Sequence, residues 1–246
     1  MHHETLTTVT TAYNRVEMNQ VGKRIDMDVE GATFATWHPI HYLTGYSWDA
    51  VTAGCLLHPG RPPASILMLG LAGGTVARQL RLLVPDVKIT AIEIDAALVD
   101  LAHTYMGLDS LKIQVEVADA YSWLKTCPGH YDVVIDDIYL SGRMDVERPI
   151  SPTGETLALL RRCLSPTGLV VANMITDGLH QALFHETRSA FSSRFAATCE
   201  IPAPKGFNHI LVGGRCLGDP ATLTPYSRCF PTRRDRDWWQ RIHVAP

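Results

Sequence analysis

The sequence predicts an α/β protein whose main sheet is mostly parallel and covered by helices on both faces, with a small β region ahead of it. Two observations carry this prediction. Over residues 65–215, short apolar runs alternate with segments of helical periodicity, which is typical of parallel strands joined by right-handed crossovers. Over residues 12–37, polar and apolar residues alternate with period two between the turn signals QVGK and EGAT, which indicates antiparallel strands.

The composition is that of an ordinary globular protein. Of the 246 residues, 46% are hydrophobic and 19% charged, and the net charge of −3 gives no sign of a nucleic-acid-binding surface. Six cysteines are scattered without a C-x-x-C pair or a cluster with histidine, so no metal site is expected. No apolar run reaches the ~18 residues that cross a bilayer, and the first residues lack a signal-peptide pattern. We therefore expect a cytoplasmic protein that binds neither nucleic acid nor membranes.

The first 60 residues predict two or three antiparallel strands and then a lead-in helix at residues 46–57. A β region this small does not fold alone. It is expected to pack on the main domain, cover the mouth of a ligand site or make a dimer contact, so a homodimer is a possible partner state. The predicted division is an N-terminal region at 1–60, an α/β domain at 61–218 and a solvated or packed tail at 219–246.

Seven strands are expected in the α/β domain. The last two, at residues 196–203 and 208–215, leave no room for a helix between them and must pair antiparallel. Seven strands with such a final pair form the Rossmann-like sheet of class I S-adenosylmethionine-dependent methyltransferases, whereas the dinucleotide fold has six parallel strands. The other strands are expected at 65–70, 88–95, 111–119, 131–139 and 169–175, and the helices at 75–85, 96–107, 120–126, 151–168 and 178–195.

A glycine-rich turn, within LGLAGGTVARQL at residues 69–80, joins the first of these strands to its helix. In an open α/β sheet the ligand lies over the carboxyl ends of the strands, next to this turn. Gly70, Gly73 and Gly74 let the backbone approach a ligand, and the helix beyond Thr75 offers free N–H groups. A turn that needs glycine for structural reasons alone remains the alternative.

Acidic residues follow the next three strands. Glu93 and Asp95 come about 20 residues after the glycines, where an acid accepts hydrogen bonds from ribose hydroxyls. Acids at successive strand ends favour a cationic ligand that carries a nucleoside over a pyrophosphate, which they would repel. The residues expected to bind this ligand are Gly70, Ala72, Gly73, Gly74, Thr75, Glu93, Ile94, Asp95, Asp119, Ala120 and Asp136.

Four stretches, ILMLGLAGGTVARQL, AIEIDAALVDLA, VEVADAYSWL and YDVVIDDIY, occur in this order. Together they resemble the successive motifs of the spermidine synthase family, including its methyltransferase-like relatives, over roughly residues 10–215. The resemblance implies that Glu93 binds the ribose and Asp119 the adenine of an S-adenosylmethionine-type ligand. It also places Asp137 at the position of the family's catalytic aspartate, which deprotonates the attacking amine.

Three departures from the family pattern bear on the reaction. Gly73 stands where aminopropyltransferases carry an acid in the glycine loop, and Leu140 replaces a second aspartate. Trp48, Asp49 and Ala50 replace a Tyr-His-Glu. The missing acids would hold the ammonium groups of a polyamine and of decarboxylated S-adenosylmethionine, whereas an acid in the loop would repel the carboxylate of the intact compound. S-adenosylmethionine is therefore the expected cofactor.

Methyl transfer requires the protein to hold an acceptor in line with the methyl group and, where needed, to take its proton. Asp137 is the expected base, with Tyr139 as a hydrogen-bonding or cation-stabilising wall beside it. Alternatively, Asp136 and Asp137 cap the next helix or bind the amino group of the cofactor. The candidate acceptor-binding residues, for which packing is the alternative role, are His41, Tyr42 and Trp48.

The polar loop SGRMDVERPIS, residues 141–151, directly follows the strand that leads to Asp137. In the related enzymes a loop here forms a gate over the substrate. Arg143, Glu147 and Arg148 are candidates to select a charged acceptor or to close against the cofactor, and a plain connecting loop is the alternative.

Three functions remain open on the sequence. Methyl transfer to a small-molecule nucleophile is favoured because the acids of polyamine enzymes are absent. Transfer of an aminopropyl or 3-amino-3-carboxypropyl arm is the alternative within the family. A non-catalytic cofactor-binding protein is the third, and it predicts that Asp137→Asn has no effect on function.

Overall fold

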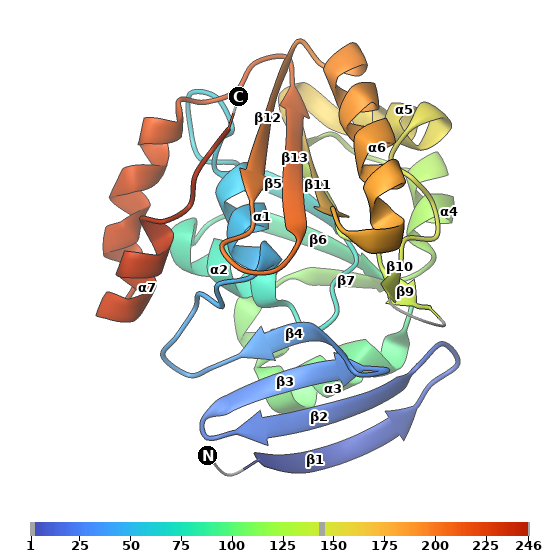
Figure 1. Cartoon of the computed structure of the whole chain (residues 1–246), viewed down its shortest axis with the longest axis vertical. Coiled ribbons are helices and arrows are strands. Elements are labelled where there is room, and N and C mark those ends of the chain that lie inside the picture. The colour runs from blue at the N-terminus through green and yellow to red at the C-terminus, as the bar shows by residue number, and fades with distance from the viewer. Residues whose placement is uncertain (1–2, 143–145, 246) are drawn as a thin grey trace.

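The computed structural model describes residues 3–142 and 146–245, which form a central sheet covered by helices, a smaller sheet at one end and a C-terminal helical segment (Figure 1). Within these residues the central sheet has seven strands in the order β12-β13-β11-β8-β5-β6-β7. Strand β13 runs antiparallel to both of its neighbours, which confirms the predicted class of sheet. The strands are β5 Ser65–Leu69, β6 Lys88–Glu93, β7 Gln114–Val117, β8 Tyr131–Asp136, β11 Leu164–Ile175, β12 Ala197–Pro202 and β13 Asn208–Gly214.

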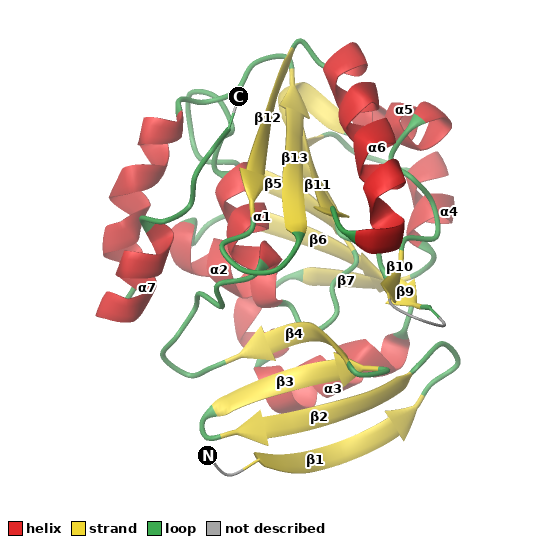
Figure 2. Cartoon of the chain, viewed as in Figure 1, coloured by secondary structure: helices red, strands yellow, loops and turns green. Residues whose placement is uncertain are grey.

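Helices cover both faces of this sheet (Figure 2). Successive residues of a strand point to opposite faces, so Ile66 and Met68 join one hydrophobic core and Leu67 and Leu69 the other. Burial on both faces explains why β5 is an unbroken apolar run. The first core is completed by α1 Ser47–Cys55, α2 Thr75–Leu83 and α3 Ala96–Met106, and the second by α4 Ala120–Lys125, α5 Gly154–Arg162 and α6 Gln181–Arg194.

One expected helix is too long. The prediction covered residues 151–168, but α5 ends at Arg162 and β11 begins at Leu164. Leu164 pairs with Tyr131 of β8, and the Tyr131 backbone N–H donates to Cys163 O over 2.7 Å. Pairing with β8 therefore extends β11 over the Ser-Pro-Thr-Gly stretch, which the sequence indicated only as the end of a helix.

The N-terminal sheet is an antiparallel meander in the order β1-β2-β3-β4 (blue in Figure 1). The sequence predicted two or three strands and missed β1, whose side chains are mostly exposed on both faces because it lies at the edge of the sheet. Strand β2 packs on α3 and β4 packs on α2, which confirms the expected packing on the main domain. The strands are β1 His3–Thr10, β2 Arg15–Val21, β3 Arg24–Val29 and β4 Ala32–Trp37.

The C-terminal segment is packed rather than solvated. It contains the 3₁₀ helix η3, Pro220–Cys229, and the helix α7, Arg233–Trp239. Trp239 is buried, and its ring N–H donates to Leu223 O over 2.8 Å. In the described part of the chain, no helix combines the length and the apolar character that crossing a membrane requires.

Candidate active site

A cavity of about 640 Å³ lies at the carboxyl edge of the central sheet. Its walls also include parts of the N-terminal sheet, the segment 38–48, the loop 138–150 and α7. Gly73, Gly74 and Asp136 were expected at a ligand site but are not among its described lining residues. The expected residues that do line it are His41, Tyr42, Trp48, Gly70, Ala72, Thr75, Glu93, Ile94, Asp95, Asp119, Ala120, Asp137 and Tyr139.

The glycine-rich turn is held by Glu93 at the end of β6. Its Oε2 accepts hydrogen bonds from the backbone N–H groups of Leu71 and Ala72, each over 3.0 Å. Gly70 has φ +84°, and a Cβ there would lie 2.3 Å from Asp137 O. The turn therefore needs glycine at position 70 for both conformation and space.

Gly73 has a different reason to be glycine. A Cβ at this position would lie 2.2 Å from Met106 Sδ and 2.6 Å from Ala35 Cβ, because α3 and β4 pack against the turn there. Position 73 thus points into protein packing and away from the cavity. An acidic side chain would not fit at position 73 without a shift of these neighbours, so packing gives Gly73 a reason that does not involve the ligand. Gly74, with φ +77°, is the N-cap of α2 and packs against Leu108.

Local hydrogen bonds orient the acids at the strand ends. Glu93 Oε1 accepts from the Asp95 backbone N–H over 3.1 Å. Asp95 caps α3 and accepts from the Thr11 hydroxyl over 2.6 Å, which ties the N-terminal sheet to this edge. Asp119 caps α4, with Oδ1 accepting from the Ser122 backbone N–H over 2.7 Å. Each carboxylate oxygen accepts about two hydrogen bonds, which leaves capacity for ligand hydroxyl and amino groups.

Thr75 lines the cavity, but its hydroxyl is engaged by β4. Its Oγ1 accepts from the Thr36 backbone N–H over 2.9 Å and donates to Thr36 O over 3.1 Å. The contact fixes the start of α2 against the N-terminal sheet, which covers the cavity as expected.

Asp137 follows β8 and is placed by a chain of amides. Asn173 Nδ2 donates to Asp137 Oδ1 over 2.8 Å, and Asn208 Nδ2 donates to Asn173 Oδ1 over 3.0 Å. Burial raises the pKa of Asp137, while the hydrogen bond from Asn173 and the charge of Arg148 act to lower it. A carboxylate of raised pKa at a cavity wall is suited to take a proton from a bound amine. Neither asparagine was singled out from the sequence, which carries no local signal for them.

Tyr139 lines the cavity, and its hydroxyl is bound to the sheet. The hydroxyl donates to Asn173 O over 2.9 Å and accepts from the Ile175 backbone N–H over 3.2 Å. The guanidinium of Arg148 lies 4.8 Å from the ring centroid on the ring face. Because its hydroxyl is hydrogen-bonded to the backbone of β11, Tyr139 is a fixed part of the cavity wall and stabilises the segment that follows Asp137.

Asp136 forms an ion pair with Arg148 and does not line the cavity. Its Oδ1 lies 2.9 Å from Arg148 Nη1, and both side chains are almost fully buried. Arg148 also donates to Asn173 O over 2.5 Å. This ion pair corrects two expectations: Asp136 does not face a ligand, and Arg148 cannot select an acceptor.

The loop after β8 nevertheless covers the cavity, through Leu140, Val146, Pro149 and Ile150. It includes the short pair β9 Leu140–Ser141 and β10 Val146–Glu147. Tyr121 of α4 donates its hydroxyl to Ile150 O over 3.1 Å. Arg143, named above as a gate residue, lies outside the described residues.

Further lining residues come from the segment 38–48 and from α7; we call one group of them, His38, His41, Tyr42, Trp48 and Arg234, the distal wall. The backbone N–H of Tyr42 donates to Asp235 Oδ2 over 2.8 Å, and His41 Nδ1 lies 3.2 Å from Thr232 Oγ1. The sequence singled out His41, Tyr42 and Trp48, but it missed His38 and Arg234. Only the docking of α7 brings Arg234 to the cavity, and the local sequence of the tail does not reveal it.

Asp49, which replaces a family histidine, has a structural role. Its carboxylate is buried and accepts from the backbone N–H groups of Thr44 and Gly45 and from Gln79 Nε2. Burial raises its pKa to about 6, although these hydrogen bonds act in the opposite direction. Asp49 holds the segment that leads into α1 and does not line the cavity.

Comparison with known proteins points to one family. A family model of the spermine/spermidine synthase domain matches residues 46–204. A probable polyamine aminopropyl transferase of Bifidobacterium longum (strain NCC 2705) is 33% identical over 166 residues, which cover 65% of this chain and 36% of that protein. An eEF1A lysine and N-terminal methyltransferase homolog of Drosophila melanogaster is 24% identical over 198 residues, 77% of this chain and 28% of that protein. The chain spans about a third of the length of these curated relatives.

Solved structures share the fold. A probable spermidine synthase of Corynebacterium glutamicum ATCC 13032 superposes with a TM-score of 0.69 at 19% identity, covering 91% of this chain and 86% of the other. A spermidine synthase in complex with the transition-state analogue AdoDATO gives a TM-score of 0.68 at 16% identity, covering 93% and 80%. Likeness at this level of identity establishes a common architecture.

These comparisons contradict the expected donor, intact S-adenosylmethionine. The matched family uses decarboxylated S-adenosylmethionine to donate an aminopropyl group. Gly73 is packed against Met106 and Ala35, so the lack of an acid at this position also has a structural reason. Methyl transfer, the function favoured from the sequence, therefore has less support than its aminopropyl alternative.

Proposed function

Because the chain belongs to the spermine/spermidine synthase domain family, we propose that it transfers the aminopropyl group of decarboxylated S-adenosylmethionine to the amine of a small-molecule acceptor. The observation that carries the proposal is the row of acids along one wall of the cavity. These residues, each at or just after the carboxyl end of a parallel strand, are Glu93, Asp95, Asp119 and Asp137.

The charge of the donor suits this wall. Decarboxylated S-adenosylmethionine carries a sulfonium and an ammonium and no carboxylate, so it is a dication beside an adenosine. Carboxylates that line a partly desolvated cavity attract such a ligand more strongly than one that also carries a negative charge. In this proposal Glu93 accepts from the ribose hydroxyls and Asp119 from the adenine amino group, as the family resemblance implies.

Asp137 supplies the proton chemistry. An acceptor ammonium has no lone pair for attack, so Asp137 takes one proton from it and leaves the neutral amine. The nitrogen lone pair then forms a bond to the propyl carbon next to sulfur. The carbon–sulfur bond breaks, its electron pair stays on sulfur, and uncharged methylthioadenosine leaves. Asn173 fixes the Asp137 carboxylate by a 2.8 Å hydrogen bond, so the base is oriented before the acceptor binds.

The test is turnover of the purified chain with decarboxylated S-adenosylmethionine and a panel of primary amines. We expect release of methylthioadenosine and an acceptor whose mass grows by one aminopropyl group. A parallel reaction with intact S-adenosylmethionine should give no product. Methylation of an acceptor would refute the proposal, and donor binding without any turnover would favour the non-catalytic alternative.

A further inference from the structure

The distal wall differs in charge from the wall that carries the acids. The charged side chain among its residues is that of Arg234, which α7 brings to the cavity and which remains 45% exposed. The nearby carboxylate among the described lining residues is Asp26, and it pairs with Arg24 over 2.8 Å and accepts from the Thr36 hydroxyl. The distal wall therefore offers no unpaired carboxylate to an ammonium group.

A buried carboxylate, that of Asp235, lies behind the distal wall and pairs with Arg234. Arg234 Nη1 lies 3.6 Å from Oδ1 of Asp235, which is fully buried and absent from the described lining. The charge of Asp235 also acts on Arg78, whose guanidinium stacks 3.8 Å from the centroid of the Tyr42 ring. Asp235 thus acts on both arginines, and of the two only Arg234 is among the described lining residues.

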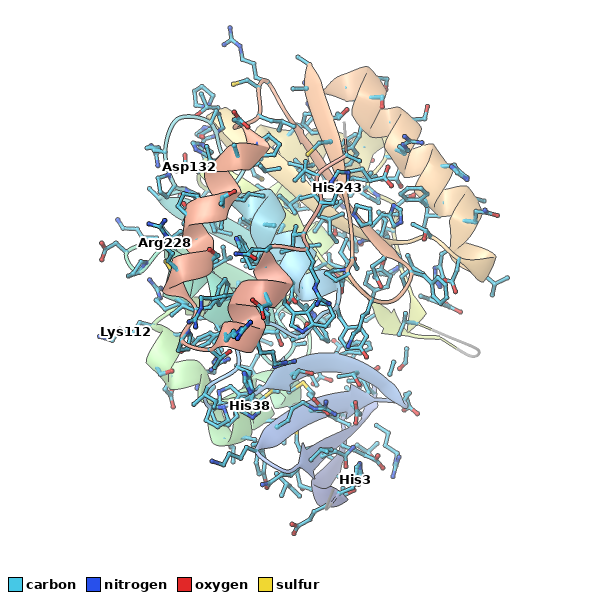
Figure 3. All side chains as sticks on the ribbon, turned by 60° about the vertical axis from the view of Figure 1, so that its left-hand side comes forward. His3, His38, Lys112, Asp132, Arg228 and His243 are labelled. Atoms are coloured by element: carbon cyan, nitrogen blue, oxygen red, sulfur yellow. The ribbon has the colours of Figure 1, made fainter. Side chains whose placement is uncertain are left out.

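His38 adds a hydrogen-bond donor to the same wall. Its Nδ1 accepts from the backbone N–H groups of Ile40 and His41, over 3.2 and 3.0 Å. The tautomer that makes these bonds carries its proton on Nε2. Burial lowers the pKa of His38, and His41, Arg234 and Arg78 lower it further. Figure 3 shows His38 between the N-terminal sheet and the C-terminal helices. His38 is one of the described residues that line the cavity.

We propose that the distal wall recognises a carboxylate at the far end of the acceptor, so that the acceptor is an amino acid with its amine and carboxylate at opposite ends rather than a diamine. Arg234 would pair with that carboxylate, and the His38 N–H would donate to it. A diamine would instead set its second ammonium against Arg234. This inference rests on the proposed function and names its acceptor class. The two residues that carry it, His38 and Arg234, both lie outside the segment 46–204 that the family model matches.

The experiment compares two acceptors with chains of five carbons, 5-aminopentanoate and 1,5-diaminopentane, with decarboxylated S-adenosylmethionine as donor. We expect kcat/KM to be about tenfold higher for 5-aminopentanoate. Arg234→Gln should lower kcat/KM for 5-aminopentanoate by about tenfold, through KM, and should leave or improve that for the diamine. Preference of the wild-type protein for the diamine, or an equal loss for both acceptors in Arg234→Gln, would overturn the inference.

The neighbouring arginine provides a matched control. Arg233 has a side chain that is 88% exposed and lies 3.6 Å from Asp237 on the surface of α7. Arg233→Gln removes the same charge from the same helix and should leave kcat/KM for both acceptors unchanged. An equal effect of the two substitutions would mean that the overall charge, and not a contact in the cavity, sets the preference.

A separate measurement distinguishes this inference from the proposed function. If neither acceptor is consumed, aminopropyl transfer to such amines is refuted. Calorimetric titration with 5-aminopentanoate in the presence of methylthioadenosine then tests whether the distal wall binds a carboxylate. Binding that weakens about tenfold in Arg234→Gln would support a carboxylate site. Equal binding to the wild-type and variant proteins, or no binding to either, would overturn it.

Discussion

The Asp137 carboxylate depends on residues from two other strands. Asn173 of β11 and Asn208 of β13 form the chain of amides that orients it, and neither is close to it in the sequence. The amide of Asn173 donates to the charged form of Asp137, so it opposes the rise in pKa that burial causes. Position and basicity of the proposed base are therefore set by the same hydrogen bond.

Replacing Asp137 by Asn should lower kcat for aminopropyl transfer by about 10²- to 10⁴-fold, because the acceptor amine loses its base. In the wild-type protein kcat/KM should fall as the pH drops through the raised pKa of Asp137, since the protonated acid cannot take a proton. Measured pH profiles check both points. Asn173→Ala should move this acid limb to higher pH, and a limb that stays in place would contradict the assignment of Asp137 as the base.

Gly70→Ala should lower the free energy of unfolding by about 3 kcal/mol, because the new Cβ would meet a carbonyl oxygen and φ is positive. Gly60 is the matched control: it has φ +79°, but a Cβ there would have no neighbour within 4 Å. Gly60→Ala should cost about 1 kcal/mol. Urea denaturation measures both, and equal losses would mean that the contact with Asp137 O is unimportant.

Asp49 should make stability depend on pH. Its pKa is about 6 in the folded protein against an ordinary value of 3.8, so the folded state binds the proton more tightly. The stabilising contribution of this proton is complete below about pH 4 and is lost as the pH rises through about 6, by about 3 kcal/mol. The difference in free energy of unfolding between the wild-type protein and Asp49→Asn should therefore change by this amount between pH 4 and pH 7. A constant difference would contradict the raised pKa.

At the scale of elements, the loop after β8 is anchored to the sheet by the buried ion pair between Asp136 and Arg148. Arg148→Met should destabilise the protein by about 3–5 kcal/mol, because it leaves the Asp136 carboxylate buried without its partner. Arg233→Met, which breaks an exposed pair on α7, should cost less than about 1 kcal/mol. Denaturation curves compare the two, and similar costs would show that the Asp136 charge is compensated elsewhere.

At the scale of the whole molecule, the cavity is assembled from three parts of the chain: the central sheet, the N-terminal sheet and α7. Thr11 joins the N-terminal sheet to Asp95, and Tyr42 joins the segment before α1 to Asp235 of α7. The C-terminal tail is therefore part of the candidate site as well as of the hydrophobic core.

Trp239→Ala should lower the free energy of unfolding by about 3–5 kcal/mol, because Trp239 is 3% exposed and packs against Phe230. It should also weaken acceptor binding, since α7 carries Arg234. Trp238→Ala is the control: this ring is only partly buried and stacks with Lys205 and Arg241, so its loss should cost less. Denaturation together with KM measurements checks both effects, and an equal cost at the two positions would contradict the docking of α7 through Trp239.

Local patterns in the sequence were enough to predict the central sheet and the row of acids beside it. Alternation of apolar runs and helical periods predicts the strands because burial on both faces demands it along the chain. Glu93, Asp119 and Asp137 were placed together because parallel strands end at one edge, and each of these residues lies at or just after the end of a strand. Both predictions depend only on patterns among residues that are close together in the sequence, which explains why they succeeded.

Tertiary structure alone decided which of these residues face the cavity and what else joins them. Asp136 and Asp137 are adjacent, and only the burial of Arg148 shows that the first is engaged within the protein. The sequence suggests that the lack of an acid at Gly73 reflects the charge of the donor, whereas in the structure Met106 and Ala35 pack against this position. Strand β1, Asn173 and Arg234 depend on partners distant in the chain, and such contacts leave no periodic or local pattern by which the sequence could reveal them.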